Sequence, residues 1–138
     1  MLPVLFVAAL TLAPQDGDAA GEWLLPEGSG RIRIAPCPSQ PERLCGTITA
    51  IRPRPAGAAA PKTRDGRLAP SPQSFIGKLI LVDMKPNGTG KWNGGRFVIP
   101  GADREIRATM QLNRVGGLKV NGCVAAVLCG GQVWTRAG

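Results

Sequence analysis

The sequence predicts an all-β fold, a single antiparallel up-and-down barrel of about eight strands with one long loop. Short runs of alternating apolar and polar residues recur along the chain, separated by turns rich in Gly and Pro. No stretch shows the apolar period of an amphipathic helix. The 138 residues suit one domain. About eight such strands close into a barrel that side chains can fill or that can hold one small ligand. An open two-sheet sandwich is the alternative.

The first two predicted strands form a hairpin. Gly21–Leu25 and Arg31–Ile34 are joined by the turn Gly28-Ser29-Gly30. The second of these strands alternates strictly, so we expect its Ile side chains inside the barrel and its Arg side chains outside. A loop stiffened by three prolines then leads to the third strand, Leu44–Ile51.

The later strands are expected to follow one another as a meander. Their ranges are 75–85, 90–99, 104–112, 118–122 and 130–136. Leu79–Val82 is apolar throughout, which predicts that both faces of that strand are covered. Pro86-Asn87-Gly88 predicts a hairpin turn, and Asn93-Gly94-Gly95 predicts a bulge within the following strand.

The last predicted strand is useful only if another strand holds it. Its residues Gln132, Trp134 and Arg136 share one face. Pairing this strand with the first one, around Trp23, would close the sheet and remove both of its edges.

Residues 1–19 are expected to be a signal peptide, which leaves residues 20–138 as the barrel domain. Leu2–Leu12 is an apolar run of eleven residues, much shorter than the ~20 that span a bilayer. Small residues follow it, and cleavage after Ala19 or Ala20 fits them. The segment has no Lys or Arg before the apolar run, and the alternative is an N-terminal core strand. A cleaved signal predicts a protein that is periplasmic or secreted and not transmembrane.

The four cysteines form two close pairs, Cys37 with Cys45 and Cys123 with Cys129. Four cysteines allow three connectivities, of which pairing within each close pair is the simplest. A four-thiolate zinc site is the alternative, but the short Cys-x2-Cys spacing is missing. In an oxidising compartment we therefore expect disulfides and no bound metal.

Residues 52–74 are rich in Pro, Ala and Arg without periodicity, so we expect a long exposed loop. It is either a solvated linker or a basic binding arm. Its charged residues are Arg52, Arg54, Lys62, Arg64 and Arg67 against the single acid Asp65. The whole chain has a net charge of +8, which favours anionic envelope lipid, polysaccharide or a protein as partner. Its basic residues lack interleaved aromatics, so specific nucleic-acid binding is not expected.

The sequence predicts a non-enzymatic protein without a cofactor. It contains no His, the commonest general base and metal ligand, and no nucleophile or phosphate-binding motif. No spacing of acids argues for a carboxylate pair, although a pocket that brought together two acids such as Asp83 and Glu105 would change this expectation.

A small apolar or amphipathic molecule inside the barrel is the preferred function, and a basic surface that docks on the envelope is the alternative. The candidate ligand-binding residues are Trp92, Phe97, Ile106, Met110, Leu79 and Leu81. Trp92 is read as a core residue, with an exposed stacking surface for a sugar or base as the alternative. A barrel without an interior cavity would contradict the preferred function.

Short motifs in a specific order carry a resemblance over almost all of the expected mature chain. They are Gly21-x-Trp23, Ile34-x-Pro36-Cys37, Leu44-Cys45-Gly46, Gly90-x-Trp92-x-Gly94-Gly95, Leu118-Lys119-Val120-x-Gly122-Cys123 and Gln132-x-Trp134-Thr135-Arg136. The chain resembles the exported bacterial proteins known as domain of unknown function 2147. The resemblance implies a compartment and a fold but no biochemical activity. Residues 63–70 depart from the family's Pro- and Asp-rich segment, of which only Asp65 and the prolines remain.

An N-terminal Gly-x-Trp combined with a C-terminal Arg is also similar to the lipocalin-like, or calycin, pattern. That resemblance implies a lipocalin-like barrel with the first-strand Trp at its closed end and the last-strand Arg lying across the ring. It assigns Trp23 and Arg136 to structural closure, with Arg136 stacked on Trp23. Trp134, which shares a face of the closing strand with Arg136, is expected to have the same structural role.

Overall fold

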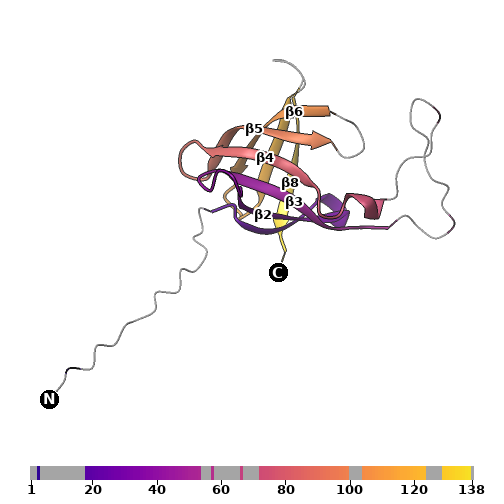
Figure 1. The fold of residues 1–138 in the computed structure, drawn as a ribbon, viewed down its shortest axis with the longest axis horizontal. Coiled ribbons are helices and arrows are strands. Elements are labelled where there is room, and N and C mark those ends of the chain that lie inside the picture. The colour runs from indigo at the N-terminus through magenta and orange to yellow at the C-terminus, as the bar shows by residue number, and fades with distance from the viewer. Residues whose placement is uncertain are drawn as a thin grey trace.

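The computed structural model is a closed antiparallel barrel whose strand order around the barrel is the order along the chain (Figure 1). It describes residues 3, 18–53, 57, 66, 72–99, 104–123 and 129–137. The strands are β1 (Gly21–Leu24), β2 (Gly30–Pro36), β3 (Leu44–Ile51), β4 (Leu79–Pro86), β5 (Lys91–Ile99), β6 (Arg104–Leu112), β7 (Leu118–Cys123) and β8 (Cys129–Arg136). The predicted barrel is therefore confirmed, and the open sandwich is excluded.

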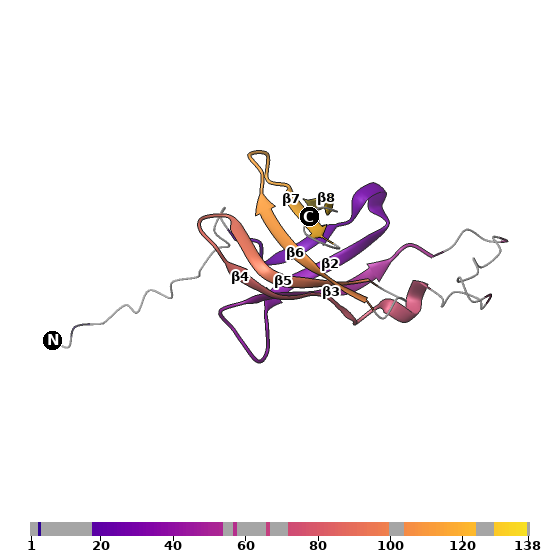
Figure 2. The same cartoon turned by 90° about the horizontal axis from the view of Figure 1, so that it is seen from above.

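Two short 3-10 helices, η1 (Pro26–Gly28) and η2 (Pro72–Phe75), complete the described elements. Figure 2 shows β7 and β8 across the barrel from β3 and β4, as the closed strand order requires. No helix in the described part of the chain has the length and apolar character to cross a membrane.

The barrel closes where the first strand meets the last. Trp23 lies opposite Arg136 and Leu24 opposite Thr135. The backbone N–H of Ala137 also donates to the carbonyl of Glu22, at 3.0 Å. This pairing leaves neither β1 nor β8 as the open end of a sheet, as the sequence predicted.

The start of β4 differs from the prediction. Residues 75–78 were expected in the strand, but Phe75 ends η2 and a turn follows, in which Gly77 has φ of +88°. The strand begins only at Leu79. The expectation that Leu79 faces the interior is wrong, because its side chain is 45% exposed.

A bulge between β3 and β4 explains this correction. Gly46 lies opposite Leu81 and Thr47 opposite Leu79, so one step along β3 corresponds to two steps along β4. The extra residue, Ile80, is buried together with Leu81. A bulge interrupts the alternation of faces, and it leaves Leu79 on the outer side.

The predicted bulge in β5 is confirmed. Trp92 lies opposite Met110 and Gly95 opposite Ala108, so three steps on β5 match two on β6. Gly94, with φ of +68°, supplies the left-handed residue that such a bulge favours.

The disulfide between Cys37 and Cys45 is present, with the two Cα atoms 5.0 Å apart, and it ties together the ends of the connection from β2 to β3. Cys123 is also disulfide-bonded, and its backbone lies opposite Cys129 across β7 and β8. The Cys129 side chain lies outside the described residues, so its pairing with Cys123 stays a prediction.

Residues 1, 2 and 4–17 of the expected signal peptide and most of the loop 52–74 lie outside the described residues, including Arg54, Lys62, Arg64, Asp65 and Arg67. Asp18 and Ala19 are described and lie against the barrel, and cleavage at either expected point would remove them. Arg52, at the start of that loop, is described and belongs to the barrel. Its backbone N–H donates to the carbonyl of Ser29, at 2.8 Å, and its guanidinium donates to the carbonyl of Glu27.

Candidate functional site

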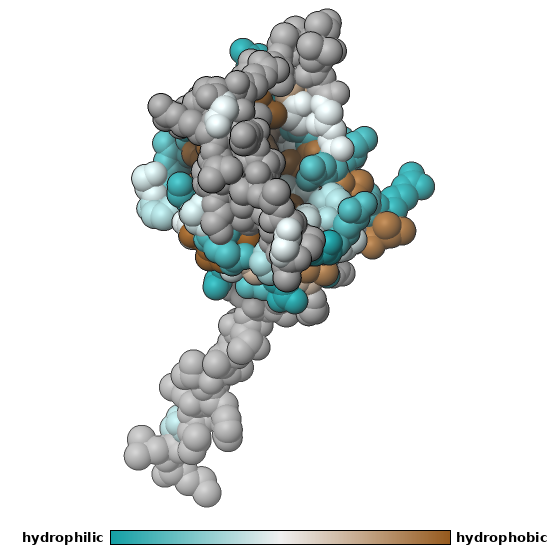
Figure 3. All heavy atoms as spheres, turned by 90° about the vertical axis from the view of Figure 1, so that its right-hand side faces the viewer, coloured by the Kyte–Doolittle hydropathy of each residue, from teal (hydrophilic) through white to brown (hydrophobic). Residues whose placement is uncertain are grey.

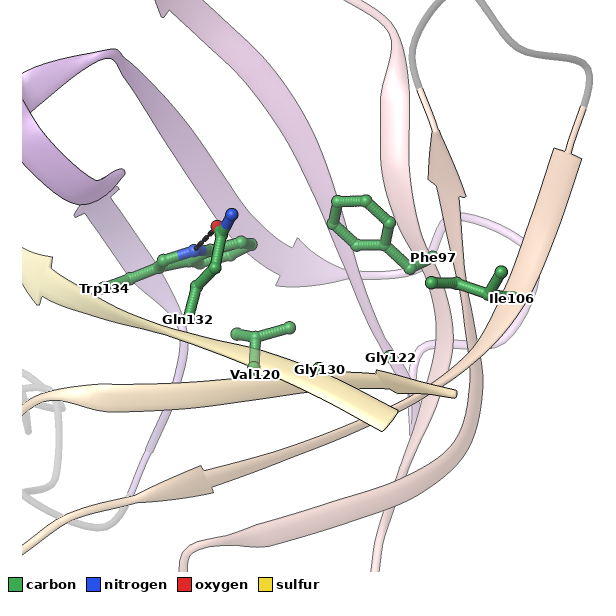
Figure 4. Close-up of a pocket in the computed structure, with 8 residues that line it drawn as sticks. Phe97, Ile106, Val120, Gly122, Gly130, Gln132 and Trp134 are labelled. Carbon is green, nitrogen blue, oxygen red and sulfur yellow. Dashed lines mark hydrogen bonds between the residues drawn. The ribbon is translucent and has the colours of Figure 1, made fainter. Parts of the chain in front are cut away.

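A cavity of about 410 Å³ lies at one end of the barrel (Figure 4). It is lined by Phe97, Ile106, Val120, Gly122, Gly130, Gly131, Gln132 and Trp134. These residues come from four consecutive strands, β5 to β8, near the end of the barrel where β5 and β7 finish and β6 and β8 begin. We call this the pocket end. The volume falls within the range of roughly 300–1,000 Å³ that is usual for small-molecule sites.

The register of β7 and β8 explains why the barrel is hollow there. Three opposed pairs follow one another toward the pocket end, and their members are Leu118 and Trp134, Val120 and Gln132, and Gly122 and Gly130. The side chains become smaller with each step. The first pair is fully buried, whereas the last pair contributes no side chain at all, so the interior is filled at one end and empty at the other.

Phe97 and Ile106 form the opposite wall of the cavity, where they lie directly across from each other on β5 and β6. Ile106 also crosses over Gly122 of the neighbouring strand. A Cβ added at Gly122 would lie 2.4 Å from the Ile106 Cδ1 atom, so this glycine is needed to let the Ile106 side chain lie where it does.

Among the described residues that line the cavity, the polar side-chain atoms belong to Trp134 and Gln132, and these two side chains are hydrogen-bonded to each other. Trp134 Nε1 donates to Gln132 Oε1, with 3.1 Å between nitrogen and oxygen (Figure 4). None of the described residues that line the cavity carries a charge. The described lining is therefore suited to holding an apolar body.

The predicted ligand-binding residues divide into three groups. Phe97 and Ile106 line the cavity. Leu81, Trp92 and Met110 are packed in the buried core. Leu79, as described above, faces outward. The structure thus places Trp92 in the core, where it also borders a second hollow of about 380 Å³ near Asp18 and Glu42.

Sequence reasoning missed the glycine and glutamine side of the pocket. Gly122, Gly130 and Gln132 all lie on predicted strands, and Gln132 had been placed on the same face as Trp134. The sequence does show a glycine on each of two neighbouring strands. Two such glycines leave a hollow only if the strand register places them opposite each other, as it does here. Trp134, assigned to closure, lines the cavity as well.

The opposite end of the barrel is built around Trp23 and Arg136, and we call it the locked end. The guanidinium carbon of Arg136 lies 4.4 Å from the centroid of the Trp23 ring, a stacking distance. The same guanidinium donates to the carbonyls of Ala20, at 3.1 Å, and Asp18, at 2.5 Å. Trp23 Nε1 donates to the carbonyl of Ala19, at 2.8 Å.

Gly21 makes this arrangement possible. Its φ of +128° is a conformation that side chains rarely adopt, and an added Cβ would lie 3.0 Å from Arg136 Nη1. The Gly-x-Trp pattern and the C-terminal Arg are thus parts of one structural contact, with the geometry that the lipocalin-like resemblance implies.

Asp83 and Glu105 approach the same cation on the outside of the barrel. Arg96 Nη2 lies 3.5 Å from Asp83 Oδ2, and Arg96 Nη1 lies 3.0 Å from Glu105 Oε2. Neither acid lines the cavity at the pocket end. The two acids therefore form a surface ion-pair network, not the pocket-borne pair that would have suggested catalysis.

Asp83 also lies near the two sulfur atoms of Cys37 and Cys45, with the ligand atoms within 4.8 Å of one another. Zinc is bound by thiolates, whereas these two sulfurs are bonded to each other. The group is consequently not a zinc site while the disulfide is intact.

A solved structure of similar fold belongs to a Helicobacter pylori protein described as a member of the lipocalin family. The TM-score is 0.63 with 14% sequence identity, over 88% of this chain and 84% of that chain. At this identity the likeness shows the fold alone. No curated protein matches the sequence significantly.

The family comparison covers almost the whole barrel. The family model described as an uncharacterised protein conserved in bacteria, DUF2147, matches residues 21–136. This span runs from Gly21 to Arg136, the two residues in contact at the locked end. The chain therefore belongs to the DUF2147 family, and its fold is a lipocalin-like barrel.

Proposed function

We propose that this protein is an exported, non-enzymatic binder of one small apolar or amphipathic molecule, held in the cavity at the pocket end. The single observation that carries the proposal is the cavity of about 410 Å³, walled by Phe97, Ile106, Val120 and Trp134. Sites for small molecules are usually concave and mostly apolar, with few polar groups. The expected signal peptide and the Cys37–Cys45 disulfide support export.

The cavity volume sets the size of the ligand and the strength of binding. At about 30 Å³ for each water-sized group, it accommodates roughly a dozen non-hydrogen atoms. With about 0.3–0.6 kcal/mol per atom, the binding free energy would be about 4–7 kcal/mol, or a Kd between the millimolar and ten-micromolar ranges. Binding experiments therefore need ligand concentrations that reach the millimolar range.

Filling the cavity tests the proposal. An added Cβ at Gly130 meets no atom within 4 Å, so Gly130→Leu should place a side chain in the cavity without disturbing the wall. Val133→Leu adds bulk on the same strand at a residue that is 47% exposed, and it is the matched control. The probe is the neutral fluorescent dye 1-naphthylamine, which is no larger than the estimated capacity of the cavity.

We expect Gly130→Leu to weaken dye binding about tenfold or more, because the added side chain occupies the ligand's space, and Val133→Leu to leave it unchanged. Thermal unfolding of both variants checks that the barrel is intact. Equal dye affinity in a folded Gly130→Leu variant and the unsubstituted protein would contradict the proposal.

A basic surface that docks on anionic envelope lipid is the second candidate, and one observation favours it. Val115 is 90% exposed at the tip of the hairpin between β6 and β7, next to Arg114. Lys119 lies opposite the half-exposed Val133 on the neighbouring strands. On the face drawn in Figure 3, described hydrophobic residues stand in small groups between hydrophilic ones. Sedimentation with anionic vesicles should weaken as salt rises and on Arg114→Glu substitution.

A further inference from the structure

We propose that the ligand of the pocket carries a hydrogen-bond acceptor, a carboxylate or carbonyl oxygen, at the end that meets the Gln132 amide. This inference rests on the proposed function and names the class of ligand: a chain of roughly ten carbons with an acceptor head, as the estimate of about a dozen non-hydrogen atoms allows. The chemistry of one side-chain amide carries the inference.

The hydrogen bond to Trp134 fixes which way the amide faces. An indole N–H only donates, so the atom 3.1 Å from Trp134 Nε1 must be the acceptor of the Gln132 amide, its oxygen. The amide nitrogen consequently occupies the other position. Trp134 is fully buried, so its ring holds the amide in this orientation.

Gln132 Nε2 is therefore left with two N–H donors at the cavity. Figure 4 shows this nitrogen on the side of the amide turned away from the indole nitrogen. Within the described part of the chain, no acceptor lies in hydrogen-bond contact with it. The described residues that line the cavity supply no charged side chain that could take its place as the head-group partner.

The two Nε2 donors of Gln132 determine which ligand head group is favoured, because ligand binding changes their hydrogen-bond partners. Gln132 is exposed in the free protein, so water satisfies them there. A ligand that fills the cavity displaces this water. A purely apolar ligand leaves both donors without a partner, which is unfavourable, whereas an acceptor on the ligand restores the hydrogen bonds. An ammonium head has only donors, and it would set donor against donor.

The net positive charge of the protein also favours a ligand with a carboxylate head. The net charge of +8 attracts an anionic ligand over a cationic one. We therefore expect the protein to bind decanoate at least about tenfold more tightly than decylamine, a ligand of the same chain length with a head that only donates. Methyl decanoate has the carbonyl without the charge, and it should lie between the two.

Gln132→Glu is the test, because it keeps an acceptor for Trp134 Nε1 and replaces the two donors by a carboxylate oxygen. In competition with 1-naphthylamine, we expect this variant to bind decylamine more tightly than decanoate, which reverses the preference of the unsubstituted protein. Thr135→Glu adds the same charge to an exposed residue of the same strand. As the control for long-range electrostatics, it should keep the preference for decanoate.

The outcomes separate this inference from the function on which it rests. If the dye and both ligands bind but decanoate and decylamine compete equally, the acceptor inference is overturned and the pocket function stands. The same holds if Gln132→Glu and Thr135→Glu shift the preference by the same factor. If neither the dye nor any of these ligands binds the unsubstituted protein, both proposals fail.

Discussion

The two ends of this barrel are made by the same strands and differ in what fills them. At the locked end, Trp23 is fully buried and Arg136 lies over its ring. At the pocket end, Gly122 and Gly130 face each other and leave space. Strand β8 contributes to both. The comparison shows that side-chain size along a strand, at constant backbone geometry, decides whether a barrel is packed or hollow.

The two ends should also respond differently to substitution, one mainly in stability and the other mainly in ligand affinity. Shortening a fully buried side chain such as Trp23 at the locked end should cost the most stability, because it leaves its own volume unfilled in the core. Side chains around an existing cavity have fewer neighbours, so substitutions there should change ligand affinity more than the free energy of unfolding.

Trp23→Ala should have the largest effect. The ring is fully buried, stacks under Arg136, and donates to the carbonyl of Ala19. Truncating a buried Trp to Ala costs about 3–5 kcal/mol of unfolding free energy. Urea denaturation followed by circular dichroism measures it. If the unfolding free energy fell by less than about 1 kcal/mol, Trp23 would not be a main structural contact of the barrel.

Gly21→Ala should have an intermediate effect at the same end. The substitution forces a side chain into a φ of +128° and against Arg136 Nη1. We expect a loss of about 1–3 kcal/mol in unfolding free energy, again measured by urea denaturation. If the variant were as stable as the unsubstituted protein, the guanidinium would have room to move, and the lock would be weaker than the contact suggests.

Gly130→Ala, at the pocket end, should have the smallest effect and the opposite sign. Its φ is outside the left-handed region and an added Cβ contacts nothing within 4 Å. Replacing such a glycine reduces the freedom of the unfolded chain and raises stability by about 0.4–1 kcal/mol. A marked loss of stability would show that the pocket wall is as tightly packed as the locked end.

Much of the fold was predictable because it depends on local pattern. The alternation of apolar and polar residues predicted Ile32 and Ile34 in the core, and the glycines after Trp92 predicted the bulge in β5. The fate of Leu79 was not predictable in this way. All residues from Leu79 to Val82 are apolar, so hydrophobicity alone does not show which of them the bulge at Ile80 turns outward.

The site was less predictable than the fold, because it depends on register. Phe97 and Ile106 were named from their alternation. The hollow, in contrast, depends on the register that places Gly122 opposite Gly130, and no local pattern in the sequence sets that register. The role of Gln132 requires the direction of its amide, which is set by a hydrogen bond to Trp134 and by no pattern in the sequence.

The contact between Arg136 and the start of the barrel has a consequence for the order of events in synthesis. The hydrogen bonds of Arg136 join residues 116 and 118 positions apart. A chain that emerges from its N-terminus onward holds β1 long before β8 exists. Until the last strand arrives, the growing sheet has two bare edges, and long-range contacts of this kind form slowly. The barrel can therefore close only after β8 has been made, and the chain before that point lacks the contacts of Arg136 that join the last strand to the first.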